Sequence, residues 1–312
     1  MRHQKFIESV QNYMDPLSEV FSLLEMQSAA TSRLEAGGAW ALRFPGKPYL
    51  KFHAVLRGQC WLTLPNQPPC RLDTGDTFLL ANSPPFVLSN DLSLEADDAA
   101  RLFAPTRSNI YRHGGDDTVL LGGGFVFQSD NTQLLLDTLP AFIHIPAREP
   151  AAVTLRRTLE TLDEELGTAQ MGASLVTRRL ADILLVQALR AYVTLHGVDS
   201  AGWIGALKDR RIGTALNLMH ADVRHNWEVG ELAAAVNMSR SGFAARFKEL
   251  VGLPPLEYLL RWRMQLAREA LRRNEGTISS LATRLGYASE SAFGNAFRRV
   301  HGRAPKRYWS GR

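Results

Sequence analysis

Two stretches of this chain repeat each other at an offset of 50 residues, and this repeat restricts the fold more than any other feature. A spacing shared by seven positions indicates one supersecondary unit built twice. The matched pairs are Ser239 and Ser289, Ser241 and Ser291, Phe243 and Phe293, Phe247 and Phe297, Gly252 and Gly302, Pro255 and Pro305, and Tyr258 and Tyr308.

Each copy has the pattern of a helix-turn-helix. A short apolar segment, 231–236 or 280–285, is followed by a break and then by a serine where a helix N-cap is expected. Behind each serine, phenylalanines recur at helical spacing and predict a buried stripe. The opposite face carries small and polar residues near the helix start, so it can enter a major groove about 12 Å wide. The outward residues are Arg240, Ser241, Ala244, Ala245 and Lys248 in the first copy and Glu290, Ser291, Gly294, Asn295 and Arg298 in the second.

The excess of basic charge lies on the repeated half of the chain. Residues 203–312 contain 19 Lys and Arg against 9 Asp and Glu, a net charge of +10, which leaves 17 against 22, or −5, for residues 1–202. This asymmetry is typical of a nucleic-acid-binding domain, because phosphate contacts supply most of the non-specific affinity. A single basic run such as Arg272-Arg273 could equally be a solvated helix face.

The segment from Arg211 to Tyr308 closely resembles the DNA-binding domain of AraC/XylS transcriptional regulators. The resemblance rests on Asn237-Met-Ser-Arg-Ser-Gly-Phe-Ala-Ala-Arg-Phe247 and on residues 254–258, 261–264 and 285–293. It implies two helix-turn-helix units rigidly joined by a long helix, here roughly 255–272, with their second helices in successive major grooves. It also implies a homodimer and contact with RNA polymerase, and we expect the chain to activate transcription.

Side-chain chemistry suggests roles for the outward residues. Asn295 could make the paired hydrogen bonds that asparagine forms with adenine, while serine can bond several bases and alanine can touch a thymine methyl. The alanines could equally be helix filler, and Glu290 could serve the helix dipole. We expect base contacts from Ser241, Ala244, Ala245, Glu290, Ser291 and Asn295, and phosphate contacts from Arg240, Lys248, Arg298, Arg299 and Lys306. Arg246 lies beside the core stripe and favours an intramolecular salt bridge over a DNA contact.

The first 140 residues predict an antiparallel β-barrel or a double-sheet roll. Short apolar or alternating runs are separated by turn signals such as Gly114-Gly115 and Gly122 to Gly124. The predicted strands lie at 40–45, 52–56, 60–64, 77–80, 86–88 and 118–121. The expected fold class is α+β, with a cupin-like N-terminal barrel, a helical segment, and an all-α C-terminal domain of two helix-turn-helix units.

Residues 14–145 resemble the cupin-type sensor domain of one branch of these regulators. The resemblance rests on Asp15-Pro-Leu-Ser and on residues 40–44, 52–58, 72–76 and 86–89. A small barrel can hold a ligand, so we expect a small-molecule effector bound by Trp40, His53, Trp61 and Phe86, which could equally be ordinary core residues.

No metal and no other cofactor is expected in the barrel. In this branch a histidine is common where Phe86 stands, which leaves His53 alone on its strand. Cys60, Cys70 and His113 could complete a site only if the fold brings them together.

Two helices are predicted between the halves, marked by leucines from Leu155 to Leu166 and by apolar residues from Leu180 to Ala191. One face could pack on the barrel and another on a second chain. We expect a sensor domain at 1–145, a helical dimerisation segment and linker at 146–202, with 195–202 as the linker, and a DNA-binding domain at 203–312.

The remaining sequence features are those of a cytoplasmic, nucleoid-associated protein. Two cysteines provide no disulfide framework, and we see neither a signal peptide nor an apolar run of membrane-spanning length. The prediction is a sequence-specific transcription regulator and not an enzyme. The alternatives are a cupin-type metalloenzyme with a DNA-binding appendage and a protein that coats DNA through charge alone.

Overall fold

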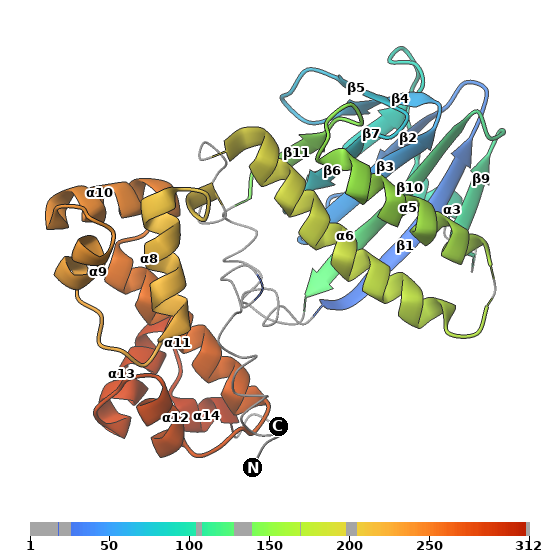
Figure 1. Cartoon of the computed structure of the whole chain (residues 1–312). Helices are drawn as coiled ribbons and strands as arrows, with labels where there is room; N and C mark the ends of the chain where they lie inside the picture. Colours follow the sequence, from blue (N-terminus) through green and yellow to red (C-terminus); the bar gives the residue numbers. More distant parts are fainter. Residues whose placement is uncertain are drawn as a thin grey trace. The chain divides into compact units, whose positions relative to one another are not determined.

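The computed structural model describes Ser18 and residues 26–103, 108–127, 139–168, 170–197 and 205–309. Its contacts divide the chain into two compact units, whose main described parts are residues 26–196, the N-terminal unit, and residues 205–309, the C-terminal unit. The N-terminal unit contains two β-sheets, and the C-terminal unit is entirely helical in its described part. This confirms the predicted fold class (Figure 1). Most of the predicted linker, and the Asp15-Pro-Leu part of the cupin resemblance, lie outside the described residues.

The N-terminal unit contains a six-stranded sheet of order β11-β6-β3-β10-β1-β9 and a five-stranded sheet of order β5-β4-β7-β2-β8. All neighbouring strands are antiparallel except β1 with β9 and β2 with β8. The sheets form a cupin-like sandwich rather than a closed barrel. The strands are β1 (Met26–Ala36), β2 (Ala41–Phe44), β3 (Leu50–Arg57), β4 (Gln59–Thr63), β5 (Cys70–Asp73), β6 (Thr77–Leu80), β7 (Phe86–Ser89), β8 (Asp97–Asp98), β9 (Ile110–His113), β10 (Thr118–Phe127) and β11 (Phe142–Ile145). The short helix α3 (Ala99–Phe103) follows β8.

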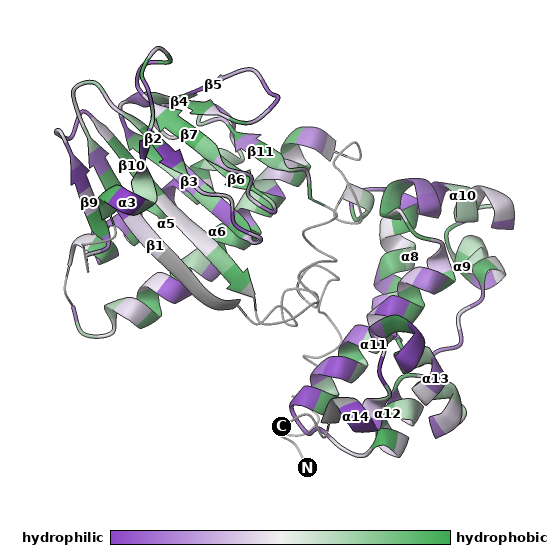
Figure 2. Cartoon of the chain, turned by 180° about the vertical axis from the view of Figure 1, so that it is seen from behind, coloured by the Kyte–Doolittle hydropathy of each residue, from purple (hydrophilic) through white to green (hydrophobic). Residues whose placement is uncertain are grey.

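An apolar core fills the space between the two sheets. One buried cluster joins the two sheets. It contains Trp40, Leu42 and Phe86 from the smaller sheet and its flanks, and Val55 and Phe78 from the larger sheet. Hydrophobic and hydrophilic residues vary along the strands, as expected for sheets with one buried face (Figure 2).

The run Gly122 to Gly124 lies inside strand β10, so its prediction as a turn was wrong. Gly122 pairs with His53 of β3, and a Cβ at Gly122 would lie 2.6 Å from Nδ1 of His53. The glycine therefore provides space for a histidine ring on the neighbouring strand, a reason for glycine that has nothing to do with a turn.

Two helices, α5 (Ala152–Gly167) and α6 (Ala173–His196), cover the larger sheet in the same unit. They pack against each other and against β1, through apolar residues that include Leu155, Leu162 and Leu184 (Figure 1). Both helices occur where the leucine spacing predicts them, because each has a stripe that needs a partner surface.

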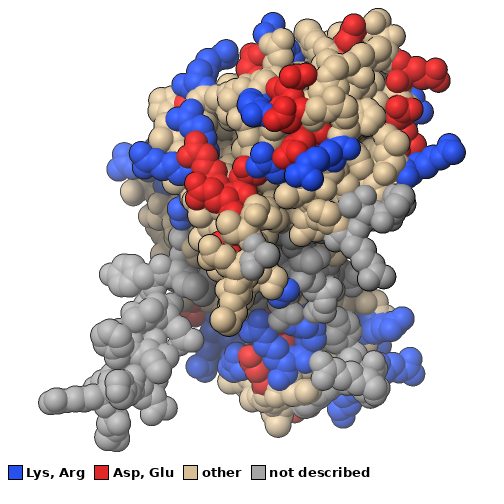
Figure 3. Space-filling view, turned by 90° about the vertical axis from the view of Figure 1, so that its right-hand side faces the viewer, with Lys and Arg blue, Asp and Glu red and all other residues tan. Residues whose placement is uncertain are grey.

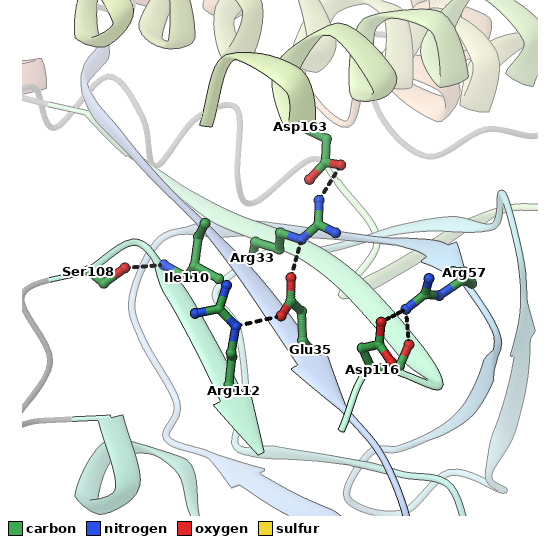
Figure 4. Close-up of polar contacts among 8 residues, drawn as sticks. All are labelled: Arg33, Glu35, Arg57, Ser108, Ile110, Arg112, Asp116 and Asp163. Carbon is green, nitrogen blue, oxygen red and sulfur yellow. Dashed lines mark hydrogen bonds and ion pairs between the residues drawn. The ribbon is translucent and has the colours of Figure 1, made fainter. Parts of the chain in front are cut away.

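A polar network ties helix α5 to the sheet (Figure 4). Arg33 of β1 donates to Asp163 of α5, and its Nε lies 3.0 Å from Oε1 of Glu35. The other carboxylate oxygen of Glu35 accepts from Nε of Arg112 on β9 at 2.9 Å. The nearby pair of Arg57 and Asp116 is largely exposed and contributes little to stability.

The described part of the C-terminal unit contains seven helices with complete bounds, from α8 to α14, preceded by the helical residues 205–206. They are α8 (Arg210–Ala221), α9 (Val229–Ala235), α10 (Arg240–Val251), α11 (Pro255–Arg272), α12 (Ile278–Arg284), α13 (Glu290–His301) and α14 (Pro305–Trp309). The bounds of α11 match those predicted for the linking helix, which begins with proline at its first position. Among the described helices of the whole chain, none is both long and apolar enough to cross a membrane.

Candidate nucleic-acid interface

Both repeats fold as helix-turn-helix units, α9–α10 and α12–α13. The Ser239 hydroxyl accepts from the backbone N of Gly242 at 3.2 Å, and the Ser289 hydroxyl accepts from the backbone N of Ala292 at 3.1 Å. Both predicted N-caps are therefore confirmed. The second helices end in the same way, at Gly252 with φ 81° and at Gly302 with φ 71°, in the left-handed region that glycine adopts readily.

Paired phenylalanines anchor the second helix of each unit. Phe243 and Phe247 of α10 are fully buried, as are Phe293 and Phe297 of α13. Ring centroids within the pairs lie 5.7 and 5.9 Å apart. Because one face of each helix is held in a core, the opposite face is directed away from it.

Most of the predicted DNA-contacting residues lie on this outward face or at its ends, whereas Lys306 lies on α14. Ala244 is half-buried, and the others are exposed: Arg240, Ser241, Ala245, Lys248, Glu290, Ser291, Asn295, Arg298, Arg299 and Lys306. A small side chain at 241, 244 and 245 leaves room for a close approach of the α10 backbone to a partner. In Figure 3, most of the charged side chains visible on the C-terminal unit are Lys and Arg, whereas the N-terminal unit shows both signs of charge.

Arg246 forms salt bridges within the protein, as the sequence favoured. Its Nη2 lies 3.2 Å from Oδ2 of Asp209, and its Nη1 lies 3.1 Å from Oε2 of Glu249. Asp209 caps helix α8 by accepting from the backbone N of Arg211 and Ile212. Although burial acts to raise it, the pKa of Asp209 is held below its usual value by these backbone hydrogen bonds and by Arg246. Arg246 therefore joins α10 to the start of α8.

The polar face of α13 has internal contacts that a DNA complex would have to exchange. Nη2 of Arg298 donates to Oδ1 of Asn295 at 3.2 Å. Nη2 of Arg299 lies 3.6 Å from Oε2 of Glu257 on α11. The other oxygen of Glu257, Oε1, accepts from Nε of Arg261 at 2.9 Å. Asn295 is therefore positioned by Arg298 before any base is met.

A buried arginine on α11 joins the two helix-turn-helix units. Arg263 is 8 % exposed, and it donates to the carbonyl O of Val223 at 2.8 Å and of His225 at 2.7 Å, in the loop that leads to α9. Its guanidinium also lies 5.8 Å from the ring centroid of Tyr287, in the turn between α12 and α13. Burial lowers the pKa of Arg263 from its ordinary value. The sequence shows Arg263 only as part of a basic run, so its contacts were not predicted.

The same junction is closely packed at the turn of the second unit. A Cβ at Gly286 would lie 2.2 Å from the carbonyl O of Arg224 and 3.0 Å from Nη2 of Arg263. Near the start of α11, Nε2 of His220 on α8 lies 2.7 Å from the Tyr258 hydroxyl. Helix α11 therefore contacts both units through specific partners.

Two hollows in the C-terminal unit are lined by arginine. One, of about 300 Å³, lies between the start of α8 and the turn after α9, and the other, of about 680 Å³, lies where α13 passes into α14. Residues of the first are Arg210, Arg211, Thr214, Ala235, Val236 and Asn237, and those of the second are Arg298, Gly302, Arg303, Ala304 and Arg307. Sequence reasoning missed Arg210, Arg211, Arg303 and Arg307, because none of them lies on the outward stripe of α10 or α13.

Three of the four predicted effector residues lie in the interior of the N-terminal unit. Trp40, His53 and Phe86 are buried, and the His53 ring lies 5.3 Å from that of Phe86 and 5.0 Å from that of Phe78. Trp61 is half-buried and lies on the other face of β4 from the core residues of that strand. The structure therefore does not bring Trp61 together with the other three.

Burial lowers the pKa of His53 to about 3, with a smaller contribution from the charge of Lys51. Nε2 of His53 and Nε1 of Trp40 are buried without a hydrogen-bond partner among the described residues. Cys60 and Cys70 are free thiols. Among the described parts of the chain, no group of three or more His, Cys, Asp or Glu side chains could hold a metal ion.

Two family models and two sequence relatives agree with this architecture. A cupin family model matches residues 15–194, and a helix-turn-helix domain model matches residues 232–310. A protein of Streptomyces antibioticus and one of Streptomyces lividans, both named as AraC-like transcription regulators, are 41% and 42% identical over 297 residues, which covers 95% of this chain and 98% of each relative. Among solved structures, the DNA-binding domain of AdpA in complex with a target DNA is 30% identical, with a TM-score of 0.30, over 31% of this chain and 88% of that one.

Proposed function

The chain belongs to the AraC-like family of transcription regulators, and from that premise we propose that it recognises its operator by inserting α10 and α13 into the major groove. The observation that carries the proposal is the pair of capped helices, each held by two buried phenylalanines and exposing small and polar residues on a strongly basic unit. Linkage through α11 and Arg263 would keep the two helices at one separation.

Roles within the proposed interface follow from side-chain chemistry. We propose that Ser241, Ala244, Ala245, Glu290, Ser291 and Asn295 face base edges, and that Arg240, Lys248, Arg298, Arg299 and Lys306 contact phosphates. In the free chain Arg298 donates to the Asn295 oxygen, and this bond would be exchanged when Asn295 pairs with a base and Arg298 turns to a phosphate.

The two classes of contact respond differently to substitution. We expect Asn295→Ala to lower discrimination between the operator and other duplexes by about 1–3 kcal/mol, because a base contact is lost. Lys248→Ala should weaken binding to every duplex and flatten the plot of log K against log salt by about 0.9, because one phosphate contact is lost. Fluorescence anisotropy with operator and scrambled duplexes, over a salt series, measures both effects.

Asn217→Ala is the matched control for this experiment, because Asn217 is exposed on α8, a helix outside both helix-turn-helix units. It should change neither quantity. Equal losses on all duplexes from Asn295→Ala and Lys248→Ala would instead support a protein that coats DNA through charge.

We further propose that α6 carries the homodimer contact. Val176 and Ile183 are 41% and 47% exposed, and they lie on one stripe with the half-buried Leu180. The buried residues of α6 face the sheet and α5 instead. A two-fold protein would present two DNA-binding units to two half-sites.

Sedimentation should show a dimer for the native chain and a monomer for Val176→Glu with Ile183→Glu, since two charges would have to be buried in the contact. Ser174→Glu, at an exposed position on another side of the same helix, should leave the dimer intact. A native chain that sediments as a monomer with and without DNA would remove this part of the proposal.

Control by a small molecule is proposed for the N-terminal unit. The partnerless Nε2 of His53 and Nε1 of Trp40 support it, because an unsatisfied buried polar atom is costly and a ligand could pair with it. Calorimetric titration of candidate compounds tests this, with His53→Leu as the variant that should lose the response. We also propose that the chain activates transcription through contact with RNA polymerase, in the cytoplasm where promoter DNA lies. Residues 1–145 would bind the effector, residues 146–202 would dimerise and link, and residues 203–312 would bind DNA.

A further inference from the structure

The hollow at the end of α13 gathers three guanidinium groups. Arg298 lies on the last turns of the helix, Arg303 follows the left-handed Gly302, and Arg307 lies on α14. All three side chains are exposed, and the space they line is about 680 Å³. In the described part of the chain, no carboxylate forms an ion pair with Arg303 or Arg307. Three positively charged residues that line one hollow favour an anion inside it.

The internal repeat provides a comparison within the same chain. At the offset of 50 residues, Arg303 corresponds to Leu253 and Arg307 corresponds to Glu257, while Arg298 corresponds to Lys248. Both units have the same left-handed glycine at this point, with φ 81° and 71°. In the first helix-turn-helix unit, Lys248, Leu253 and Glu257 therefore sum to no net charge. The three corresponding residues of the second unit carry three positive charges. The common fold does not require the arginines, so their presence needs another reason.

The surrounding charge increases the effect. From Glu290 to the last residue, the sequence contains six Lys and Arg and a single carboxylate side chain, that of Glu290, at the opposite end of α13. The hollow is also continuous with the outward face of α13, because Arg298 lines the hollow and donates to Asn295 on that face. A double helix that seats on this face would bring its phosphate backbone to the edge of the groove, next to the hollow.

We propose that Arg298, Arg303 and Arg307 form an anchor for the DNA backbone, which grips phosphates at the border of the groove entered by α13. Planar guanidinium groups suit phosphate oxygens because they can donate two parallel hydrogen bonds. The second helix-turn-helix unit would then hold DNA more tightly than the first and would set the register of both. This inference rests on the proposed function, because it requires that α13 faces the major groove.

The test replaces Arg303 and Arg307 by glutamine in the full-length protein. The probes are a duplex enriched from a random pool by the native chain and a scrambled duplex of the same composition. The plot of log K against log salt should become shallower by about 1.8 for both duplexes, and binding at about 0.1 M salt should fall roughly 60-fold, since each phosphate contact contributes a slope of about 0.9. The preference between the two duplexes should persist, because the anchor reads no bases.

Arg101→Gln is the control for the loss of a single arginine charge, because it makes the same kind of substitution at an exposed position of the N-terminal unit. It should leave the salt slope unchanged. Thermal unfolding of the double variant should match that of the native chain, because both arginines are exposed.

An unchanged slope for the double variant, while the native chain still prefers the enriched duplex, would overturn the anchor and leave the proposed function standing. An unchanged slope together with lost transcription in a reconstituted polymerase assay would assign the hollow to an acidic protein surface and would also overturn it. A native chain from which no sequence is enriched would contradict the proposed function itself.

Discussion

Arg263→Met is expected to lower the free energy of unfolding of the C-terminal unit by about 3–5 kcal/mol. The substitution removes two hydrogen bonds from a charged donor, each worth about 1.5–3 kcal/mol, and leaves the carbonyl groups of Val223 and His225 without that donor. It also removes the contact with Tyr287, so the first helix-turn-helix unit loses its link to the turn of the second helix-turn-helix unit. Part of the lost free energy serves to hold the two helix-turn-helix units at a fixed separation. Each 1.4 kcal/mol of that part should lower operator affinity about tenfold.

Urea unfolding and anisotropy of the same preparations measure the two effects of Arg263→Met. Arg263→Lys is the matched variant, because it keeps the charge but replaces the planar fork with a single ammonium group. It should recover part of the stability and little of the affinity. If Arg263→Met binds the operator as the native chain does, the junction does not position the two units.

Acid is expected to destabilise the N-terminal unit through His53. Burial lowers the pKa of His53 to about 3 in the folded chain, whereas the unfolded side chain titrates near 6.5. Below about pH 6.5 the unfolded chain therefore takes up a proton that the folded chain refuses. The resulting stability is fully present above that pH and is lost as pH falls towards 3, at about 1.4 kcal/mol per pH unit.

Between pH 7 and pH 5 the His53 contribution amounts to about 2 kcal/mol. Urea unfolding of the native chain and of His53→Leu at both values measures it, and the variant should lose this part of the pH dependence. The pH range from 7 to 5 lies above the pH at which Asp76 titrates. The pKa of Asp76 lies below its usual value, because hydrogen bonds from His144 and the backbone outweigh the effect of burial. An identical pH dependence in both proteins would show that His53 is not responsible.

Local signals in the sequence were sufficient for the DNA-binding unit. Serine N-caps, phenylalanines at helical spacing and a glycine after each second helix act within a few residues of each other, so the repeat predicted α10 and α13 and their outward faces. The same holds for α11, whose bounds follow from its proline start and its apolar stripe.

Strand prediction was less complete, because pairing partners lie far apart in the chain. The runs that became β2, β3, β4, β6, β7 and part of β10 were found, but β1, β5, β8, β9 and β11 were not. Gly122 looked like part of a turn, and only its pairing with His53 explains it. Alternation along β4 could have placed Trp61 and Cys60 on different faces of the strand. Which of the two faces meets the core depends on the position of the second sheet.

The sequence alone determined that this chain has two helix-turn-helix units on a basic half, because caps, helical periodicity and net charge are properties of nearby residues. The cupin-like half before them was identified through the resemblance of its residues to a known family. Tertiary structure alone decided that the two sheets form a sandwich, that Arg263 connects the units, and that Arg298, Arg303 and Arg307 surround one hollow. These features depend on distances between residues that the folded backbone brings together, and no local pattern contains those distances.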